Sequence, residues 1–89
     1  MLKIDLSKQA QKFLKSLPGK YAKQIARKLY SLREDPYPPD AKLLKGYFYW
    51  RSRCGEYRVI YEVKGETLLV YFIGRRNDDQ IYRMLKRAD

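Results

Sequence analysis

The sequence contains no histidine and a single cysteine, Cys54, among its 89 residues. Without histidine, His-based catalytic triads, imidazole metal sites and acid–base catalysis by imidazole are excluded. One thiol cannot form an internal disulfide, and it cannot supply a thiolate zinc or iron–sulfur site. The five glycines are scattered and form no phosphate-binding loop. We therefore expect no metal and no cofactor, and any catalysis must use Lys, Arg, Tyr, Asp or Glu.

Long apolar runs are also missing. No segment approaches the ~20 apolar residues of a membrane-spanning helix, and the N-terminal residues MLKIDLSKQ lack the apolar region of a signal peptide. A lone cysteine is compatible with a reducing compartment. These features predict a cytoplasmic protein without a membrane partner. The length allows one small domain, residues 1–89.

Positive charge is in excess. Twenty Lys and Arg against ten Asp and Glu give a net charge of +10, while hydrophobic residues make up 45% of the chain. The apolar fraction is enough for a modest core. The charge favours a polyanionic partner, which can be a nucleic acid, an acidic protein or an anionic membrane surface.

Helical periodicity dominates the first half of the chain. Alternation over residues 2–6 predicts a short strand. Apolar positions at spacings of three and four predict helices over 7–17 and about 20–33, separated by a Pro-Gly pair. Either Asp5 or Ser7 can cap the first helix. Two helices joined by so short a turn form an antiparallel hairpin.

The second half is rich in aromatic and β-branched residues. Segments 47–53, 57–63 and 67–73 are predicted strands, with Cys54-Gly55 and Lys64-Gly65 as two-residue turns. The fold class is therefore α+β: an N-terminal strand, an α-helical hairpin packed on a small antiparallel sheet, and a short C-terminal helix. That last helix is predicted over residues 78–87.

The predicted turns also fix a register. Trp50 faces Val59, and Arg51 faces Arg58. The face expected to pack on the helices carries Phe48, Trp50, Tyr57, Val59, Tyr61, Val63, Leu68, Val70 and Phe72. The opposite face carries Tyr49, Arg51, Arg53, Glu56, Arg58, Ile60, Leu69 and Tyr71.

The second of these faces is basic and interleaved with aromatic rings. Arginine binds phosphate bidentately and tyrosine stacks on unpaired bases, so the face is typical of nucleic-acid binding. Arg75 and Arg76 extend the positive charge just beyond the third of these strands. The alternative is a solvated polar face, in which Arg53 pairs with Glu56.

Three motifs resemble the RelE/ParE superfamily of bacterial and archaeal toxins. They are Leu44-Lys45-Gly46, the hairpin Arg53-Cys54-Gly55-Glu56-Tyr57-Arg58 continuing to Tyr61, and Arg75-Arg76 before Tyr82. The resemblance covers essentially the whole chain and implies the RelE-like microbial RNase fold. It also implies a toxin of a type II toxin–antitoxin system, partnered by a cognate antitoxin with an acidic, amphipathic binding segment.

The RelE-like branch cleaves mRNA in the ribosomal A site. The ribose 2′-hydroxyl attacks the adjacent phosphate without a metal, so the ribosome and mRNA are further implied partners. The resemblance implies that Arg58 and Arg76 occupy the positions of the family's catalytic arginines. It implies that Tyr82 occupies the position of the family's late tyrosine. The two lysine positions of the family fall on Tyr49 and Arg51. These five form the predicted catalytic set, and the predicted RNA-binding residues are Lys45, Arg53, Tyr71 and Arg75.

The missing lysines leave the general base open. Tyr49 and Tyr82 are candidates if neighbouring arginines lower a phenol pKa that starts near ~10. Arg51 is a poor proton acceptor because the pKa of a guanidinium exceeds ~12. Two other functions stay open: a ParE-like inhibitor of DNA gyrase that cleaves nothing, and a non-enzymatic domain that binds nucleic acid through its basic face.

Overall fold

The computed structural model describes residues 1–44 and 48–76. The elements are β1 (Lys3–Leu6), α1 (Lys8–Ser16), α2 (Gly19–Glu34), β2 (Lys42–Leu43), β3 (Trp50–Cys54), β4 (Tyr57–Lys64) and β5 (Thr67–Arg75). The α+β class is confirmed, as is the order of strand, helical hairpin and sheet. The predicted helix over 78–87 lies outside the described residues.

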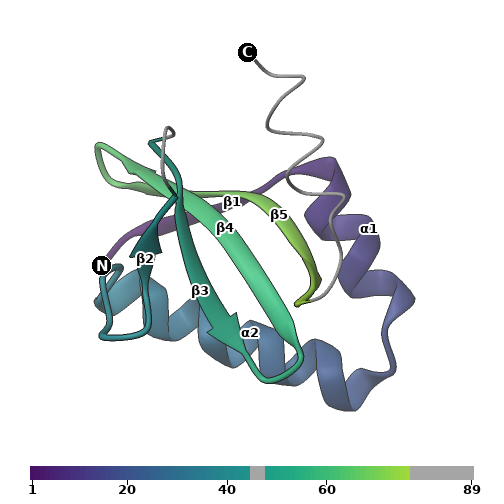
Figure 1. The fold of residues 1–89 in the computed structure, drawn as a ribbon. Helices are drawn as coiled ribbons and strands as arrows, with labels where there is room; N and C mark the ends of the chain where they lie inside the picture. Colours follow the sequence, from purple (N-terminus) through teal and green to yellow (C-terminus); the bar gives the residue numbers. More distant parts are fainter. Residues whose placement is uncertain (45–47, 77–89) are drawn as a thin grey trace.

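One five-stranded sheet has the order β1-β5-β4-β3-β2 (Figure 1). The pairs β2–β3, β3–β4 and β4–β5 are antiparallel, as predicted for β3 to β5, whereas the short strand β2 was not predicted. Strand β1 lies parallel to β5, with Ile4 beside Leu68. Strand β1 therefore forms one edge of the sheet, beside β5, and the two-residue β2 forms the other edge.

Local signals set the ends of both helices. The Ser7 hydroxyl accepts a hydrogen bond from the Ala10 N–H at 3.1 Å, so Ser7 caps α1. Leu17 is extended with ψ 147°, as the residue before a proline prefers. Pro18 then directly precedes the first residue of α2. The predicted helical boundaries are correct to within one residue.

Both helices cover one face of the sheet. The core between the layers contains Ala10 of α1, Ile25, Leu29 and Leu32 of α2, and Cys54, Tyr57, Val59, Tyr61, Leu68, Val70 and Ile73 of the sheet. A smaller cluster on the other face contains Leu44, Ile60 and Phe72, with Tyr49 packed against it. The outer face therefore combines a small apolar patch with the polar side chains of the strands.

The predicted turns are each wrong by one residue. Gly55 and Gly65 have φ of 58° and 57°, and no other described residue has positive φ. Each glycine is the first central residue of a Gly-Glu turn, the position that a type II′ hairpin gives to glycine. As a result Trp50 faces Tyr61 rather than Val59, and Arg58 faces Arg53 rather than Arg51.

A β-bulge changes the predicted faces at the end of β5. Ile60 pairs with Phe72 and Tyr61 with Val70, so Tyr71 is the extra residue. Beyond the bulge Ile73 enters the main core and Phe72 turns to the outer face, contrary to its predicted position. Phe48 was also assigned to the core face, but it precedes β3 and is 86% exposed.

Candidate nucleic-acid interface

Two arginines face each other directly on the outer side of the β-hairpin. Arg53 of β3 is paired in register with Arg58 of β4. The Arg53 N–H points away from β4 and donates to Asp40 at 2.8 Å. The pair is therefore of the type without hydrogen bonds between its members, in which facing side chains are closest. Like charges in this arrangement destabilise a sheet, whereas a bound anion between them is stabilised.

A hollow of about 170 Å³ lies beside this pair, lined by Arg53, Gly55, Tyr57, Arg58 and Arg76. Arg76 is held there by its own backbone, because its N–H donates to the Glu56 carbonyl at 2.9 Å. Its Nε also lies 3.4 Å from a carboxylate oxygen of Glu56, in an exposed ion pair. Glu56 therefore pairs with Arg76 and not with Arg53. Three predicted site residues meet at this point.

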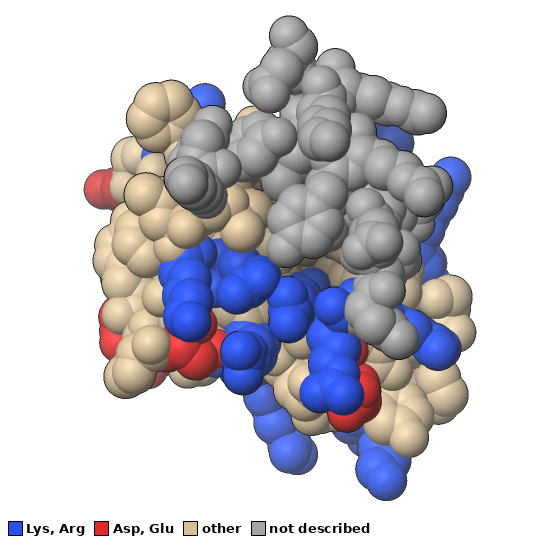
Figure 2. All heavy atoms as spheres, in the orientation of Figure 1, with Lys and Arg blue, Asp and Glu red and all other residues tan. Residues whose placement is uncertain are grey.

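The guanidinium of Arg58 has an unused donor. Among buried side-chain nitrogen and oxygen atoms of the described residues, its Nε alone has no hydrogen-bond partner. A buried donor without an acceptor costs about 1–3 kcal/mol, and more when it is charged. An oxygen of a phosphate in the hollow that Arg58 lines would satisfy this donor if the side chain turned toward it. Figure 2 shows Lys and Arg side chains in a band across this face, with fewer acidic side chains among them.

Asp40 binds β3 at the edge away from β4 and so supports the arginine pair, although no sequence pattern indicates this role. One carboxylate oxygen accepts the Arg53 N–H and, at 2.9 Å, the Ser52 hydroxyl. The other lies 3.2 Å from Lys28 Nζ on α2. Burial by itself raises the pKa of the Asp40 carboxyl, but the two hydrogen bonds and the Lys28 charge outweigh it, so the pKa lies below its ordinary value of 3.8.

Asp40 takes the place of a missing strand. Strand β2 pairs only with Trp50 and Arg51, so it ends before it can reach Arg53. Without Asp40 the outward N–H of Arg53 would lack an acceptor in the sheet. The Asp40 carboxylate thus continues the hydrogen bonding along the edge of β3 as far as Arg53, the residue that faces Arg58.

Two predicted site tyrosines lie together farther along the same face. The rings of Tyr49 and Tyr71 meet edge to face with centroids 4.8 Å apart. The Tyr71 hydroxyl donates to a Glu62 carboxylate oxygen at 2.6 Å. Burial, followed by this hydrogen bond, raises the Tyr71 pKa well above its ordinary value of 10. Tyr71 therefore stays protonated near neutral pH and offers its ring rather than a base.

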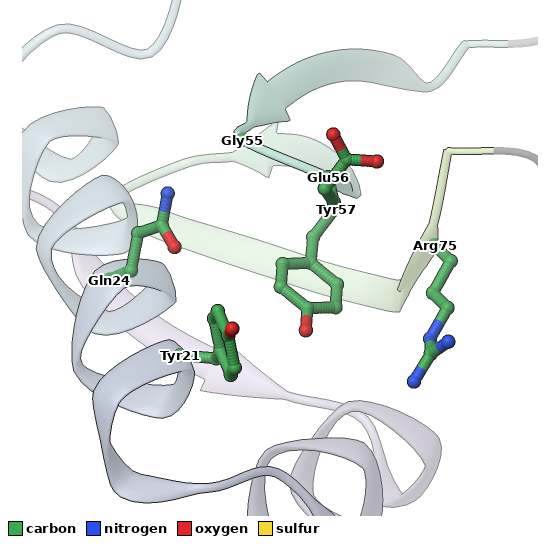
Figure 3. A pocket seen from close by; sticks show the side chains of 6 residues that line it. All are labelled: Tyr21, Gln24, Gly55, Glu56, Tyr57 and Arg75. Atoms are coloured by element: carbon green, nitrogen blue, oxygen red, sulfur yellow. The ribbon is translucent and has the colours of Figure 1, made fainter.

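The other predicted site residues are dispersed. Arg51 faces Ile60 on one side and Lys42 on the other, between the arginine hollow and the tyrosine pair. Arg75 points into a second hollow on the helical side (Figure 3). Lys45 and Tyr82 lie outside the described residues.

The described part of the chain shows neither a metal-binding cluster nor a membrane-spanning helix. No group of three or more His, Cys, Asp or Glu residues within 1–44 and 48–76 is placed to hold a metal ion. Neither α1 nor α2 combines the length and the apolar character needed to cross a membrane.

Known proteins with this fold are toxins and toxin–antitoxin complexes. RelE–RelB from Pyrococcus horikoshii OT3 superposes with a TM-score of 0.75 at 27% identity, covering 85% of this chain and 96% of that one. RelB–RelE from Methanococcus jannaschii gives 0.67 at 30% identity, covering 94% and 98%. The isolated E. coli RelE toxin gives 0.74 and covers both chains fully, but at 22% identity it supports the fold alone.

No curated protein matches the chain by sequence, but a family model does. The family model described as "ParE toxin of type II toxin-antitoxin system, parDE" matches residues 4–80. The chain therefore belongs to the RelE/ParE superfamily and is a toxin of a type II toxin–antitoxin system.

Proposed function

We propose that this toxin is a ribosome-dependent endoribonuclease that cleaves mRNA in the ribosomal A site and so inhibits translation. The observation that carries the proposal is the unpartnered, buried Nε of Arg58, in a hollow shared with Arg53 and Arg76. Three arginines line this hollow, and among the described residues Glu56 is the one carboxylate paired with any of them. A phosphodiester supplies the missing acceptors, and arginine is the side chain best matched to phosphate geometry.

The proposed reaction is attack by the ribose 2′-oxygen on the adjacent phosphorus. The new O2′–P bond forms as the P–O5′ bond breaks, leaving a 2′,3′-cyclic phosphate and a free 5′-hydroxyl. Negative charge grows on the phosphoryl oxygens in the transition state. Arg58 and Arg76 would stabilise this charge, and donors fixed in place before the reaction are the most effective kind. Arg53 and Arg51 would hold the flanking backbone.

Proton transfer needs a separate group. Tyr71 is unsuited to act as the base because its pKa is raised and its hydroxyl is committed to Glu62. Tyr49 and Tyr82 stay the proposed candidates, with Tyr49 placed on the same face against the ring of Tyr71. The ring of Tyr71 would stack on an unpaired base of the message, and Lys45 and Arg75 would add contacts to RNA.

A cognate antitoxin is the expected protein partner, since the similar P. horikoshii and M. jannaschii structures are RelE–RelB complexes. We propose that its toxin-binding segment is acidic and amphipathic. Carboxylates placed over Arg53, Arg58 and Arg76 would relieve the repulsion among these arginines and exclude RNA. Action on ribosomes would place the toxin in the cytoplasm.

One observation favours a second candidate function. The matching family model is that of ParE toxins, and Tyr49 and Arg51 occupy the positions where the nuclease branch resembled by the sequence has lysines. The alternative is therefore a gyrase inhibitor without nuclease activity.

The two candidates are separated by two assays run in parallel. Purified toxin is added to programmed ribosomes and mRNA ends are mapped by primer extension, while the same preparation is tested for inhibition of gyrase supercoiling. We expect cleavage within the A-site codon and unaffected supercoiling.

Arg58→Ala and Arg76→Ala should lose cleavage and keep the fold, whereas Arg27→Ala, at an exposed arginine on α2, should leave cleavage normal. Inhibited supercoiling with an intact message would favour the alternative. RNA binding with neither activity would indicate a non-enzymatic domain.

A further inference from the structure

A second and larger hollow lies on the helical side of the β3–β4 turn. It has a volume of about 480 Å³ and is lined by Tyr21, Gln24, Gly55, Glu56, Tyr57 and Arg75. This volume lies within the range of small-molecule sites. Figure 3 shows Tyr21 and Gln24 reaching into it from α2, Tyr57 from β4 and Arg75 from the end of β5. The side chains of three elements therefore converge on one space.

The aromatic part of this hollow is held in place. The Tyr57 ring meets Phe13 edge to face at 5.8 Å and Tyr21 at 6.0 Å. Tyr57 is only 7% exposed, and its hydroxyl points into the hollow in Figure 3. Tyr21, by contrast, is 39% exposed and stands on the helical side, with Lys20 Nζ 5.7 Å from its ring centroid. A fixed, buried phenol thus lies in edge-to-face contact with a ring that is accessible to a ligand.

Gly55 brings the hairpin turn close to α2. A Cβ atom on this residue would lie 2.6 Å from the Gln24 side-chain nitrogen, so the end of this flexible side chain would have to move away from the turn. The positive φ of Gly55 requires glycine. The hollow therefore offers an amide, a guanidinium, a carboxylate and a phenol around an aromatic ring. Amide and guanidinium groups are the side chains that most often read the edges of bases.

The two hollows are neighbours. Gly55 and Tyr57 line both of them, while the consecutive residues Arg75 and Arg76 line one each. An RNA strand with its phosphate at Arg58 would need to cross only the tip of the hairpin to reach the second hollow. The lining is about half polar and half apolar, and this combination of an aromatic ring with hydrogen-bonding groups suits a base.

We infer that this hollow binds the base of a nucleotide flanking the cleaved phosphate. The inference rests on the proposed nuclease function. Tyr21 would stack on the base, and Gln24 and Arg75 would read its edge. The site would then determine which nucleotide is tolerated beside the cut.

The first test compares cleavage by three variants of α2. Wild type, Tyr21→Ala, Tyr21→Phe and Tyr30→Ala are added to ribosomes programmed with messages that carry all four bases at each position beside the cut. Tyr30 is the matched control because it lies on the same helix, is 60% exposed and is absent from the hollow. We expect Tyr21→Ala to lose the base preference at one position and to lower kcat/KM about tenfold. Tyr21→Phe and Tyr30→Ala should retain the wild-type profile.

The second test does not depend on cleavage. The message carries 2′-deoxyribose at the nucleotide before the cut, so it cannot be cleaved by 2′-attack. In the ribosome-bound complex, 4-thiouridine is placed on one side of the cut or on the other as a photo-cross-linking probe. We expect a photo-cross-link to the peptide that contains Tyr21 from one of the two positions.

A wild-type base preference for Tyr21→Ala, together with the absence of this cross-link, would overturn the inference. So would a Tyr21→Ala variant that cleaves normally and loses affinity only for its antitoxin. If the wild type cleaves no message, the proposed function fails, and the cross-link alone decides whether the hollow binds RNA.

Discussion

Replacing Asp40 should loosen the arginine pair and destabilise the fold. Asp40→Ala removes the acceptor of the Ser52 hydroxyl, which is fully buried, and of the Arg53 N–H. An unsatisfied buried hydroxyl costs about 1–2 kcal/mol and the lost backbone hydrogen bond about 1 kcal/mol. The ion pair with Lys28 is partly exposed and adds less than about 1 kcal/mol. We therefore expect a loss of about 3 kcal/mol in the free energy of unfolding, or about 12–24 °C in Tm for a domain of this size.

The assay is urea unfolding of wild type, Asp40→Ala, Asp40→Asn and Asp35→Ala at several pH values. Asp40→Asn keeps an acceptor oxygen and should lose about 1 kcal/mol. Asp35 lies in the same loop and accepts only the Tyr37 N–H at 3.1 Å, so its removal should cost less than about 1 kcal/mol.

The pH dependence gives an independent check on Asp40. Its pKa is lower in the folded state than the ordinary 3.8, so its contribution is present above that value and is lost as the pH falls through the folded pKa. The difference in stability between wild type and Asp40→Ala should therefore shrink in acid. Equal stability of Asp40→Ala and Asp35→Ala at pH 7 would refute the argument that Asp40 replaces a strand.

Three further predictions concern the packing and titration of the fold. Gly74→Ala should cost about 1–3 kcal/mol in chemical denaturation, because its Cβ would lie 2.4 Å from the Phe72 ring; a neutral result would contradict the bulge. Trp50→Ala should cost about 3 kcal/mol, since the ring packs on the core and meets Tyr37 at 4.8 Å; normal melting of this variant would count against that packing. Burial raises the pKa of Tyr61 and Tyr71 above 10, so stability should fall as the pH rises past 10, and two of the nine tyrosines should resist ultraviolet titration while the chain is folded. Full titration of all nine in the folded protein would refute this.

The helices were predictable because their signals are local. Apolar spacing, a serine cap and a proline between the helices lie within a few residues of the boundaries they set. The strands followed from composition in the same way. Even the wrong register kept most faces, because sliding a strand by two residues returns each side chain to the same side of the sheet.

The errors in the predicted strand register and sheet faces arose where the sequence allows two backbone geometries. A glycine can take either central position of a two-residue turn, and the observed register, in which Cys54 faces Tyr57 and Lys64 faces Thr67, shows that Gly55 and Gly65 take the first. The bulge at Tyr71 lies within a run of apolar residues, so alternation gave no sign that Phe72 and Ile73 exchange faces. The shift at the Gly55 turn alone brings Arg53, instead of Arg51, opposite Arg58.

The candidate site was only partly predictable for a related reason. The basic residues of the hairpin were evident from charge and from the family resemblance. Asp40 was not, because it contacts Lys28 and Ser52, each twelve residues away, from a proline-rich loop without a motif. The second hollow likewise depends on where α2 crosses the turn, which no local pattern specifies.

The central claim is that the Arg53–Arg58–Arg76 hollow binds the phosphate that is cleaved. The most direct measurement is the end chemistry of a message cut on the ribosome, with ribose or 2′-deoxyribose at the nucleotide before the cut. The account predicts a 2′,3′-cyclic phosphate from the ribose message, no cleavage of the 2′-deoxy message, and no cleavage of either message by Arg58→Gln. Cleavage of the 2′-deoxy message, or wild-type rates from folded Arg58→Gln, would contradict it.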